Sequence, residues 1–434
     1  MRGLRRWWDA TAGGLPATFW YLWAGLLVNR AGAFAVLFLS LYLTAARGAS
    51  ESLAGAVVGA YGAGGAVGVL LGGVLADRWG RRATLLAAHL SAAGLMVGLA
   101  FSRHLAVIAA LAALVGIAHS MPSPAFVAAI VDVVPEHRRS RAFNLQFWAF
   151  NLGMAVASLL AGLLAEASFL ALFLVDAAAT LAAAALIAWK VPETLPRRHS
   201  GPAGSRPDEA GRAVGDPVTE GVGRSRPPGL HTALTDRTFL VFVGLTFVLA
   251  VLTMQTSTIM PLAMRADGLS PSAYGTVVAL GGALIVVGQL FVPGLIDRRR
   301  AHRVLALSTG LLAVGFGALA VADQLWVYLA AAVVWTVGSM LAAPPNAQIN
   351  ADLAPPELRA RYQSVFYLTF PAASFVAPTL GGVSLQYLGE RHWLVVAALG
   401  LLAAGGHLLA GPSRERRVAA RRVAAPTRAS QPVG

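Results

Sequence analysis

The chain has no cysteine and a single lysine, Lys190, among its 434 residues. The absence of cysteine excludes disulfides and metal sites built from thiolates. Charged residues are also scarce: they make up 12% of the chain, whereas soluble domains carry roughly 25%. The phosphate-binding pattern G-x-x-x-x-G-K-[ST] is missing, which argues against an ATP-driven pump. No nucleophile–base pair or metal-ligand cluster has a useful spacing, so we expect neither an enzyme nor a cofactor.

The chain consists largely of long apolar segments. Hydrophobic residues make up 57% of the chain, and the mean hydropathy is +0.65. A run of about 20 apolar residues is long enough to cross a bilayer as a helix, and these runs lack the two-residue alternation of membrane barrels. The predicted spans are 17–44, 53–76, 83–101, 105–131, 144–166, 168–189, 238–262, 271–296, 303–321, 325–351, 363–388 and 392–411. The sequence therefore predicts an all-α membrane protein with twelve transmembrane helices.

Basic residues are distributed unevenly among the connections between these spans. Most lie in alternate connections, and only Arg47, Arg103, Arg265 and Arg391 lie in the connections on the other side. Cytoplasmic connections collect arginine and lysine, so we expect a multi-pass protein of the inner (plasma) membrane with both termini cytoplasmic. The net charge of +14 then reports orientation, and we expect contact with the lipid bilayer and none with nucleic acid.

The two halves of the chain repeat each other at a fixed offset. A shift of 220 residues aligns glycine, aspartate and arginine positions without a gap, including Gly55 with Gly275, Asp77 with Asp297, Arg78 with Arg298, and Asp132 with Asp352. The repeat predicts two six-helix bundles, in residues 1–195 and 236–412, related by a pseudo-twofold axis. Residues 196–235 are rich in glycine, proline and charge and are predicted to be a disordered cytoplasmic linker. Residues 413–434 are predicted to be a cytoplasmic tail.

The loop between the second and third spans carries the most specific motif. Its sequence, GGVLADRWGRR, resembles the signature loop of the major facilitator superfamily, with matching residues at Gly73, Leu75, Asp77, Arg78, Gly80, Arg81 and Arg82. A weaker copy, PGLIDRRRAHR, contains Asp297 and Arg298 at the corresponding place in the second half. The segments NRAGAF and DVVPEHRRSRAFN look like the drug:proton antiporter (multidrug efflux) branch of that superfamily.

This resemblance implies a monomeric transporter of a small-molecule substrate, driven by protons, whose halves rock about a central site. It also implies a cytoplasmic gate in which Asp77 caps a helix of the opposite half. Arg81 or Arg82 would pair with Asp132, and Asp352 lies at the matching place in the second half. Such a cluster forms when the cytoplasmic side closes and breaks when it opens. The alternative interpretation of the loop is a solvated, positively charged turn.

Polar and ionisable residues inside the spans are the candidates for substrate and proton binding. They are Asn29, Arg30, His119, Asn144, Trp148, Asn151, Asp176, Gln255, Asn346 and Asn350. An arginine at the centre of a span costs at least about 3 kcal/mol on insertion scales, so Arg30 must face the protein interior or a water-filled cavity. There it either binds an anionic or polar substrate group or pairs with Asp176.

Several of these candidates have a purely structural alternative. His119 either makes a structural hydrogen bond or, with an unperturbed pKa of about 6.5, takes part in a proton-coupled step. Asn144, Trp148 and Asn151 follow one another at helical spacing, so they form one face that either lines a cavity or packs against another helix.

Two features depart from the pattern of proton antiporters. The antiporter motif of the fifth span has Ser158 where the family has proline, and the proline version stands in the eleventh span at Pro378. The fourth span also lacks the intramembrane arginine of many proton-coupled exporters. We predict proton-coupled efflux of amphipathic organic compounds or drugs. The alternatives are proton-coupled uptake of a small nutrient or peptide, and a membrane receptor or scaffold that does not transport.

Overall fold

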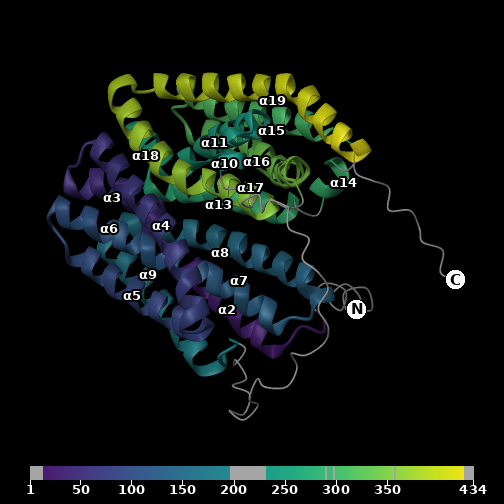
Figure 1. Cartoon of the computed structure of the whole chain (residues 1–434). Helices are drawn as coiled ribbons and strands as arrows, with labels where there is room; N and C mark the ends of the chain where they lie inside the picture. Colours follow the sequence, from purple (N-terminus) through teal and green to yellow (C-terminus); the bar gives the residue numbers. More distant parts are fainter. Residues whose placement is uncertain (1–12, 196–230, 289–290, 297–298, 356–357, 425–434) are drawn as a thin grey trace, which may run out of the picture.

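The computed structural model describes residues 13–195, 231–288, 291–296, 299–355 and 358–424, and these residues form helices without any strand. Figure 1 shows them in two bundles, the first half of the chain in purple to teal and the second in green to yellow. The first bundle contains α2 (Ala17–Ala31), α3 (Ala35–Arg47), α4 (Glu51–Arg78), α5 (Arg81–Phe101), α6 (Leu105–Ser120), α7 (Pro122–Val133), η1 (Glu136–Arg138), α8 (Arg139–Ala167) and α9 (Phe169–Lys190).

The second bundle follows the same plan. It contains α10 (His231–Thr235), α11 (Arg237–Thr258), α12 (Met260–Ala266), α13 (Pro271–Gly288), α14 (Val292–Ile296), α15 (Ala301–Gly317), η2 (Ala318–Val321), α16 (Leu325–Leu353), α17 (Arg359–Tyr367), α18 (Thr369–Leu388) and α19 (Arg391–Ala424). Most of the predicted linker lies outside the described residues, but its last five residues form α10. At the other end, α19 continues for twelve residues past 412, where we expected the bundle to end.

Among the described residues, eleven helices are long and apolar enough to cross a membrane, and a shorter apolar helix covers Leu37–Arg47. Together with α2 they account for the twelve predicted spans. The first span is wrong as a single helix, because α2 ends at Ala31 and α3 begins at Ala35. The break follows the polar pair Asn29–Arg30, where a neighbouring helix satisfies the freed backbone, as a break inside a membrane requires.

Glycines bring the two bundles into contact along two helix pairs, α4 with α18 and α8 with α13. A Cβ on Gly55 would overlap the carbonyl oxygen of Pro378, and a Cβ on Gly275 would overlap the carbonyl oxygen of Ser158. Each contact is the other shifted by 220 residues, so the predicted pseudo-twofold relation holds at the interface itself. Small residues allow this approach of helix backbones, as is usual between helices in membranes.

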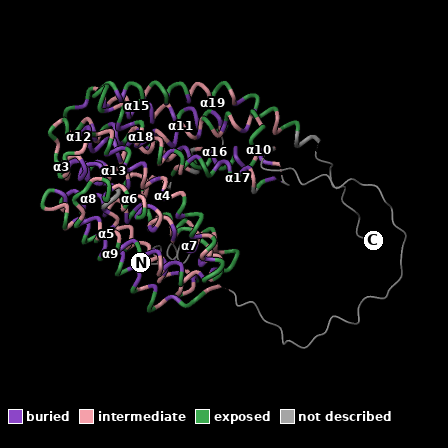
Figure 2. The backbone as a smooth tube through the Cα atoms, turned by 60° about the vertical axis from the view of Figure 1, so that its left-hand side comes forward, coloured by how far each residue is buried: buried purple, intermediate pink, exposed green. Residues whose placement is uncertain are grey.

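The bundles meet at one end of the molecule and separate toward the other (Figure 2). We call the first the closed end; it holds the starts of α4 and α13. The open end holds the starts of α5 and α15 and is rich in arginine. Hydrogen bonds between described residues join the bundles at the closed end, among them Arg265 to Thr44, Ser52 to Gln386, and Ser272 to Glu166.

Candidate functional site

A cavity of about 260 Å³ lies between the two bundles, where α4 and α6 face α11 and α18. Most of its wall is apolar or glycine, with the bulkiest apolar side chains supplied by Met254 and Phe370. A few hydroxyl groups interrupt this wall, those of Tyr61, Ser120, Ser257 and Thr258 among them. An apolar wall with a small number of polar groups is typical of sites for organic molecules that are themselves partly apolar.

Tyr61 connects this cavity to His119 in the first bundle. The Tyr61 hydroxyl lies 3.3 Å from His119 Nδ1, and the two rings pack edge to face with centroids 6.2 Å apart. His119 Nε2 is buried and has no hydrogen-bond partner among the described residues. A second buried histidine, His89 on α5, has Nδ1 2.7 Å from the carbonyl oxygen of Leu85. A phenol beside an imidazole can pass a proton between the cavity and the bundle interior.

Arg30 lies near the end of α2 and packs against α8. Its guanidinium carbon is 4.6 Å from the centroid of the Phe150 ring, a cation–π contact. A Cβ on Gly153 would lie 2.6 Å from Arg30 Cβ, so glycine is what lets α8 approach here. Arg30 Nε is buried and has no hydrogen-bond partner among the described residues. The arginine therefore keeps its charge inside the bundle with a donor to spare for an anionic or polar group.

Asp176 stabilises the break between α2 and α3. Its Oδ2 accepts a hydrogen bond of 3.1 Å from the backbone N–H of Phe34, and Thr180 donates to its Oδ1 at 3.5 Å. Asn29 Nδ2 in turn donates to the Thr180 hydroxyl at 3.2 Å. A carboxylate at the start of a helix is favourable because it pairs with backbone N–H groups and with the helix dipole. The structure thus places Asn29 and Asp176 in one network that caps α3.

The three candidates of the second bundle are buried, and none of them lines the cavity. Asn346 Oδ1 accepts a hydrogen bond of 3.0 Å from Thr246, which joins α16 to α11. Gln255 Oε1 and Asn350 Oδ1 are buried without a hydrogen-bond partner among the described residues. Gln255 Oε1 lies 3.3 Å from the position of a Cβ on Gly381, so this side chain packs against α18.

The three candidates on α8 also stay outside the cavity between the bundles. Asn144 is exposed and Trp148 is half-buried. Asn151 is buried and donates from Nδ2 to the carbonyl oxygen of Phe147 in its own helix, at 2.9 Å. The helical spacing puts these residues on one face of α8, but the structure does not direct that face into the cavity.

The signature loop lies at the open end of the first bundle. Arg81, one of the two arginines that we expected to reach Asp132, does so, with Nε 3.0 Å from Asp132 Oδ2. The same guanidinium lies 3.4 Å from Asp77, whose side chain is 77% exposed. Asp77 therefore pairs within its own bundle, and the described residues form no contact from it to the second bundle.

A carboxylate that the sequence did not single out caps the helix after this loop. The backbone N–H groups of Arg81 and Arg82 donate to Glu193 at 2.8 and 3.2 Å. Burial raises the pKa of Glu193, but the backbone hydrogen bonds from Leu195, Arg81, Thr194 and Arg82 together outweigh it, so the pKa lies below its usual value. Gly80 precedes the helix with φ of 104°, a conformation that favours glycine.

The remaining motif residues play less specific parts in this conformation. Arg78 is exposed, and a Cβ on Gly73 would meet nothing within 4 Å. Asp352 is half-buried near the end of α16. Asp297 and Arg298, the second copy of the motif, lie outside the described residues.

Two residues that the sequence analysis missed join the bundles at the closed end. Glu166 of α8 accepts a hydrogen bond of 3.2 Å from the backbone N–H of Ser272, at the start of α13. Gln386 of α18 accepts one of 3.1 Å from Ser52, at the start of α4. Positions 166 and 386 differ by 220, as do 52 and 272, so the two caps are copies of each other. The repeat therefore held the signal for this pair of contacts.

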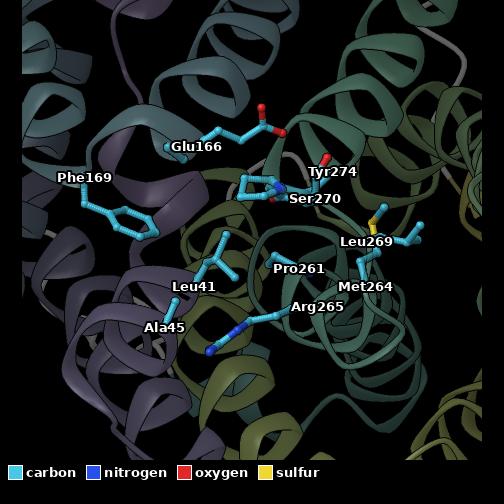
Figure 3. A pocket seen from close by; sticks show the side chains of 12 residues that line it. Leu41, Ala45, Glu166, Phe169, Pro261, Met264, Arg265, Leu269, Ser270 and Tyr274 are labelled. Carbon is cyan, nitrogen blue, oxygen red and sulfur yellow. The ribbon is translucent and has the colours of Figure 1, made fainter.

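A pocket of about 320 Å³ lies beside these contacts, between α3, α8, α12 and α13. Figure 3 shows Glu166 on one side of it and Arg265 on the other, with Leu41 and Tyr274 between them. Arg265 Nη1 donates to the Thr44 hydroxyl of the first bundle at 2.9 Å. Both charged residues of this pocket thus hold the bundles together, which makes it part of the closed end and not of the central cavity.

Comparison with known proteins agrees with this architecture. The Major Facilitator Superfamily profile matches residues 22–378 and 244–431. An uncharacterised MFS-type transporter of Bacillus subtilis, YttB, is 28% identical over 89% of this chain and 93% of its own. The multidrug resistance protein MdtH of Klebsiella pneumoniae is 25% identical over 77% of this chain and 79% of its own.

Solved structures show the same fold at lower sequence identity. A peptide transporter of the POT type, crystallised with sulfate, superposes with a TM-score of 0.74 over 92% of this chain and 95% of its own, at 17% identity. Two bundles related by an internal repeat, the helix pairs that join them and the family match over most of the chain lead to one conclusion. This chain is a multi-pass membrane transporter that belongs to the Major Facilitator Superfamily.

Proposed function

We propose that the protein exports amphipathic organic compounds in exchange for protons, by alternating access. The observation that carries this proposal is the cavity between the bundles, whose apolar wall contains a tyrosine bonded to His119. The multidrug resistance protein MdtH among its relatives supports the same substrate class. We further propose that the protein acts as a monomer in the inner membrane, without a cofactor or nucleic acid.

The arginine-rich open end is the cytoplasmic end in this proposal, because positive charge marks the cytoplasmic side. The structure is then the inward-open state, in which the cavity takes up substrate from the cytoplasm. The Asp77 gate, including Arg81 and Asp132, closes that end later in the cycle, while the Glu166 and Gln386 caps release the other end.

The proton step is assigned to His119. A neutral imidazole that loses its bond to Tyr61 can accept a proton, and its charge would then be repelled by Arg30 nearby in the same bundle. The charge of a protonated His119 and that of a cationic substrate in the cavity beside Tyr61 would repel each other, so proton and substrate bind in alternation, as exchange requires. Asp176 is the other candidate for the proton-carrying residue, although its hydrogen bond with the backbone of Phe34 favours a structural role.

The test uses everted vesicles with an imposed proton gradient and a panel of amphipathic cations and anions. We expect collapse of the gradient when a transported compound is added, and loss of that response in His119→Gln. Arg30→Met should weaken the response to acidic compounds most strongly. Thr276→Ala, an exposed hydroxyl variant on α13 that does not line the cavity, serves as the matched control.

The two alternatives predict other outcomes of the same measurement. Uptake of a nutrient or peptide with protons gives gradient collapse only when substrate enters from the opposite face of the membrane. A receptor or scaffold gives no flux of any compound in either direction, although the intact protein is present in the membrane. Either result contradicts the export proposal.

A further inference from the structure

A pocket of about 360 Å³ lies at the open end of the second bundle, between α15, α16 and α19. It shares no lining residue with the cavity between the bundles. Its polar lining residues are Arg299, Arg300, His302, Gln348, Asp352, Arg414 and Glu415. Three arginines against two carboxylates give the pocket an excess of positive charge, which attracts an anion.

The first turn of α15 opens into this pocket without an acidic cap. Its N-cap residue, Arg300, makes no side-chain hydrogen bond to the helix, and no acidic residue lies in the first turn. A helix start carries about half a positive charge, and Arg299 and Arg300 add two full charges beside it. An anion bound here would relieve this repulsion and take the hydrogen bonds that the first N–H groups offer.

In the first bundle, a carboxylate of the chain itself caps the start of the equivalent helix. Its equivalent helix, α5, begins at a Glu193 carboxylate that accepts bonds from the N–H groups of Arg81 and Arg82. The 220-residue offset puts Ser413 at the position of Glu193 and Arg300 at the position of Gly80. The second bundle thus has a serine where the first has its capping carboxylate, and an additional arginine, Arg300, directly before the helix.

Arg414 supplies an independent sign of a ligand. It lines the pocket, its side chain is 4% exposed, and its Nη1 has no hydrogen-bond partner among the described residues. Its other two nitrogens donate to carbonyl oxygens of its own helix, those of His407 and Ala410, each at 3.1 Å. The guanidinium carbon also lies 5.7 Å from the centroid of the Phe242 ring, a cation–π contact, so Nη1 is the one nitrogen that donates to no described acceptor.

The acidic lining residues leave room for such a ligand. Glu415 is already engaged, with Oε1 2.8 Å from His302 Nδ1 and Oε2 3.9 Å from Arg300 Nη1. Asp352 stands on α16, across the pocket from the start of α15. A phosphate group offers these arginines three strong acceptor oxygens, one more than a carboxylate offers.

We propose that this pocket binds a phosphate group, with Arg299, Arg300 and the start of α15 as its donors and Arg414 behind them. The same chemistry is available from the headgroup of an anionic phospholipid and from free phosphate. Lipid is close at hand, because basic pockets at the cytoplasmic membrane surface attract such headgroups. The proposal is independent of the transported substrate.

The test measures binding to the full-length protein in nanodiscs made of phosphatidylcholine alone. Inorganic phosphate is titrated against thermal unfolding, with sodium chloride at equal ionic strength as the reference. In parallel, native mass spectrometry counts phosphatidylglycerol retained from mixed micelles. The variant is Arg299→Gln with Arg300→Gln; the matched control is Arg303→Gln, an exposed arginine on α15 that does not line the pocket.

We expect the wild type to retain phosphatidylglycerol or to be stabilised by phosphate, and the double variant to lose at least about tenfold in affinity. Arg303→Gln should stay within about twofold of the wild type. Retained lipid without a phosphate response identifies the headgroup as the source, and a phosphate response in phosphatidylcholine nanodiscs identifies the free ion. The proposal is overturned if the wild type binds neither, or if both variants lose affinity equally.

Discussion

At the scale of single residues, two substitutions of Asp176 distinguish a structural role of this carboxylate from a proton-carrying role. Asp176→Asn keeps an oxygen that can accept from the Phe34 N–H, whereas Asp176→Leu leaves that buried N–H unpaired. We expect the leucine variant to lose about 1–3 kcal/mol of stability and the asparagine variant to lose much less. Thermal unfolding in detergent measures both, and vesicle transport should survive in Asp176→Asn.

The opposite pattern would give Asp176 the chemical part. If Asp176→Asn unfolds at the wild-type temperature but no longer couples transport to protons, the carboxylate itself must ionise during the cycle. His119→Gln provides the comparison, since it removes the titrating group of the other candidate without touching the α3 cap.

Sequence alone could single out Arg30 and His119, because an ionisable residue inside an apolar span is rare and expensive. It could not find their partners. Tyr61, Phe150 and His89 are ordinary members of their helices, and they lie near the two candidates only because α4, α5 and α8 pack around α2 and α6. In the same way, the spacing of Asn144, Trp148 and Asn151 defines a face of α8 but not the direction in which it points.

At the scale of helices, the glycine contacts between bundles predict a strong positional effect. Gly55→Ala places a methyl group against the carbonyl oxygen of Pro378, so α4 and α18 must move apart at the closed end. We expect vesicle transport to fall at least about tenfold, since displacements of about 1 Å can cost that much. Gly94→Ala is the control: Gly94 is an exposed glycine of α5, and a Cβ there meets nothing within 4 Å.

Membrane levels of both glycine variants must match the wild type for this comparison to hold. Equal transport by Gly55→Ala and Gly94→Ala would contradict the view that close approach of α4 and α18 is needed to seal that end.

A second prediction at this scale concerns Asp236, whose hydrogen bonds join α19 to the start of α11. Asp236 accepts hydrogen bonds from Arg417 and Tyr362 and from the backbone of Phe239. Burial raises the pKa of Asp236, but these hydrogen bonds and the charge of Arg417 outweigh it, so the pKa lies below its usual value. A depressed pKa stabilises the fold above the unfolded-state pKa of about 3.9, and that contribution is lost as the pH falls through the folded-state pKa.

Thermal unfolding of Asp236→Asn as a function of pH tests how much the Asp236 carboxylate contributes to stability. The variant should unfold at a lower temperature than the wild type at pH 7, and the gap should shrink below about pH 4. A gap of the same size at pH 3 and pH 7 would mean that the carboxylate charge contributes nothing. Asp323→Asn, which changes an exposed carboxylate in the loop before α16, is a suitable control.

Hydropathy could place the helices because the bilayer sets both their length and their apolar character. It could not foresee where they break. The break at Gly32–Phe34 depends on the Asp176 carboxylate of a distant helix, and the extension of α19 to Ala424 accompanies the Arg417 contact with Asp236. Both are tertiary effects that no window of apolar residues contains.

At the scale of the whole molecule, the repeat predicts the two bundles but not which end is open. The side chain of Asp77 is 77% exposed and pairs with Arg81 of its own bundle, so the contact proposed with the second bundle must form in another state of the cycle. Asp77→Asn should abolish transport while the folded protein stays in the membrane and the closed end stays closed. Asp323→Asn, which removes a carboxylate far from the gate, should transport normally. Full transport by Asp77→Asn would reduce the motif to a solvated turn.

The absence of native cysteine makes alternating access itself testable. Ser52→Cys with Gln386→Cys places two thiols where α4 and α18 share a hydrogen bond at the closed end, and a short bis-maleimide linker then joins the bundles there. We expect the linked protein to be fully inactive, because an end that cannot open cannot release substrate. Each single cysteine variant treated with the same reagent should keep transporting. If the fully linked protein still transports, the closed end does not open during the cycle, and the rocking of two bundles about a central cavity cannot be how this protein works.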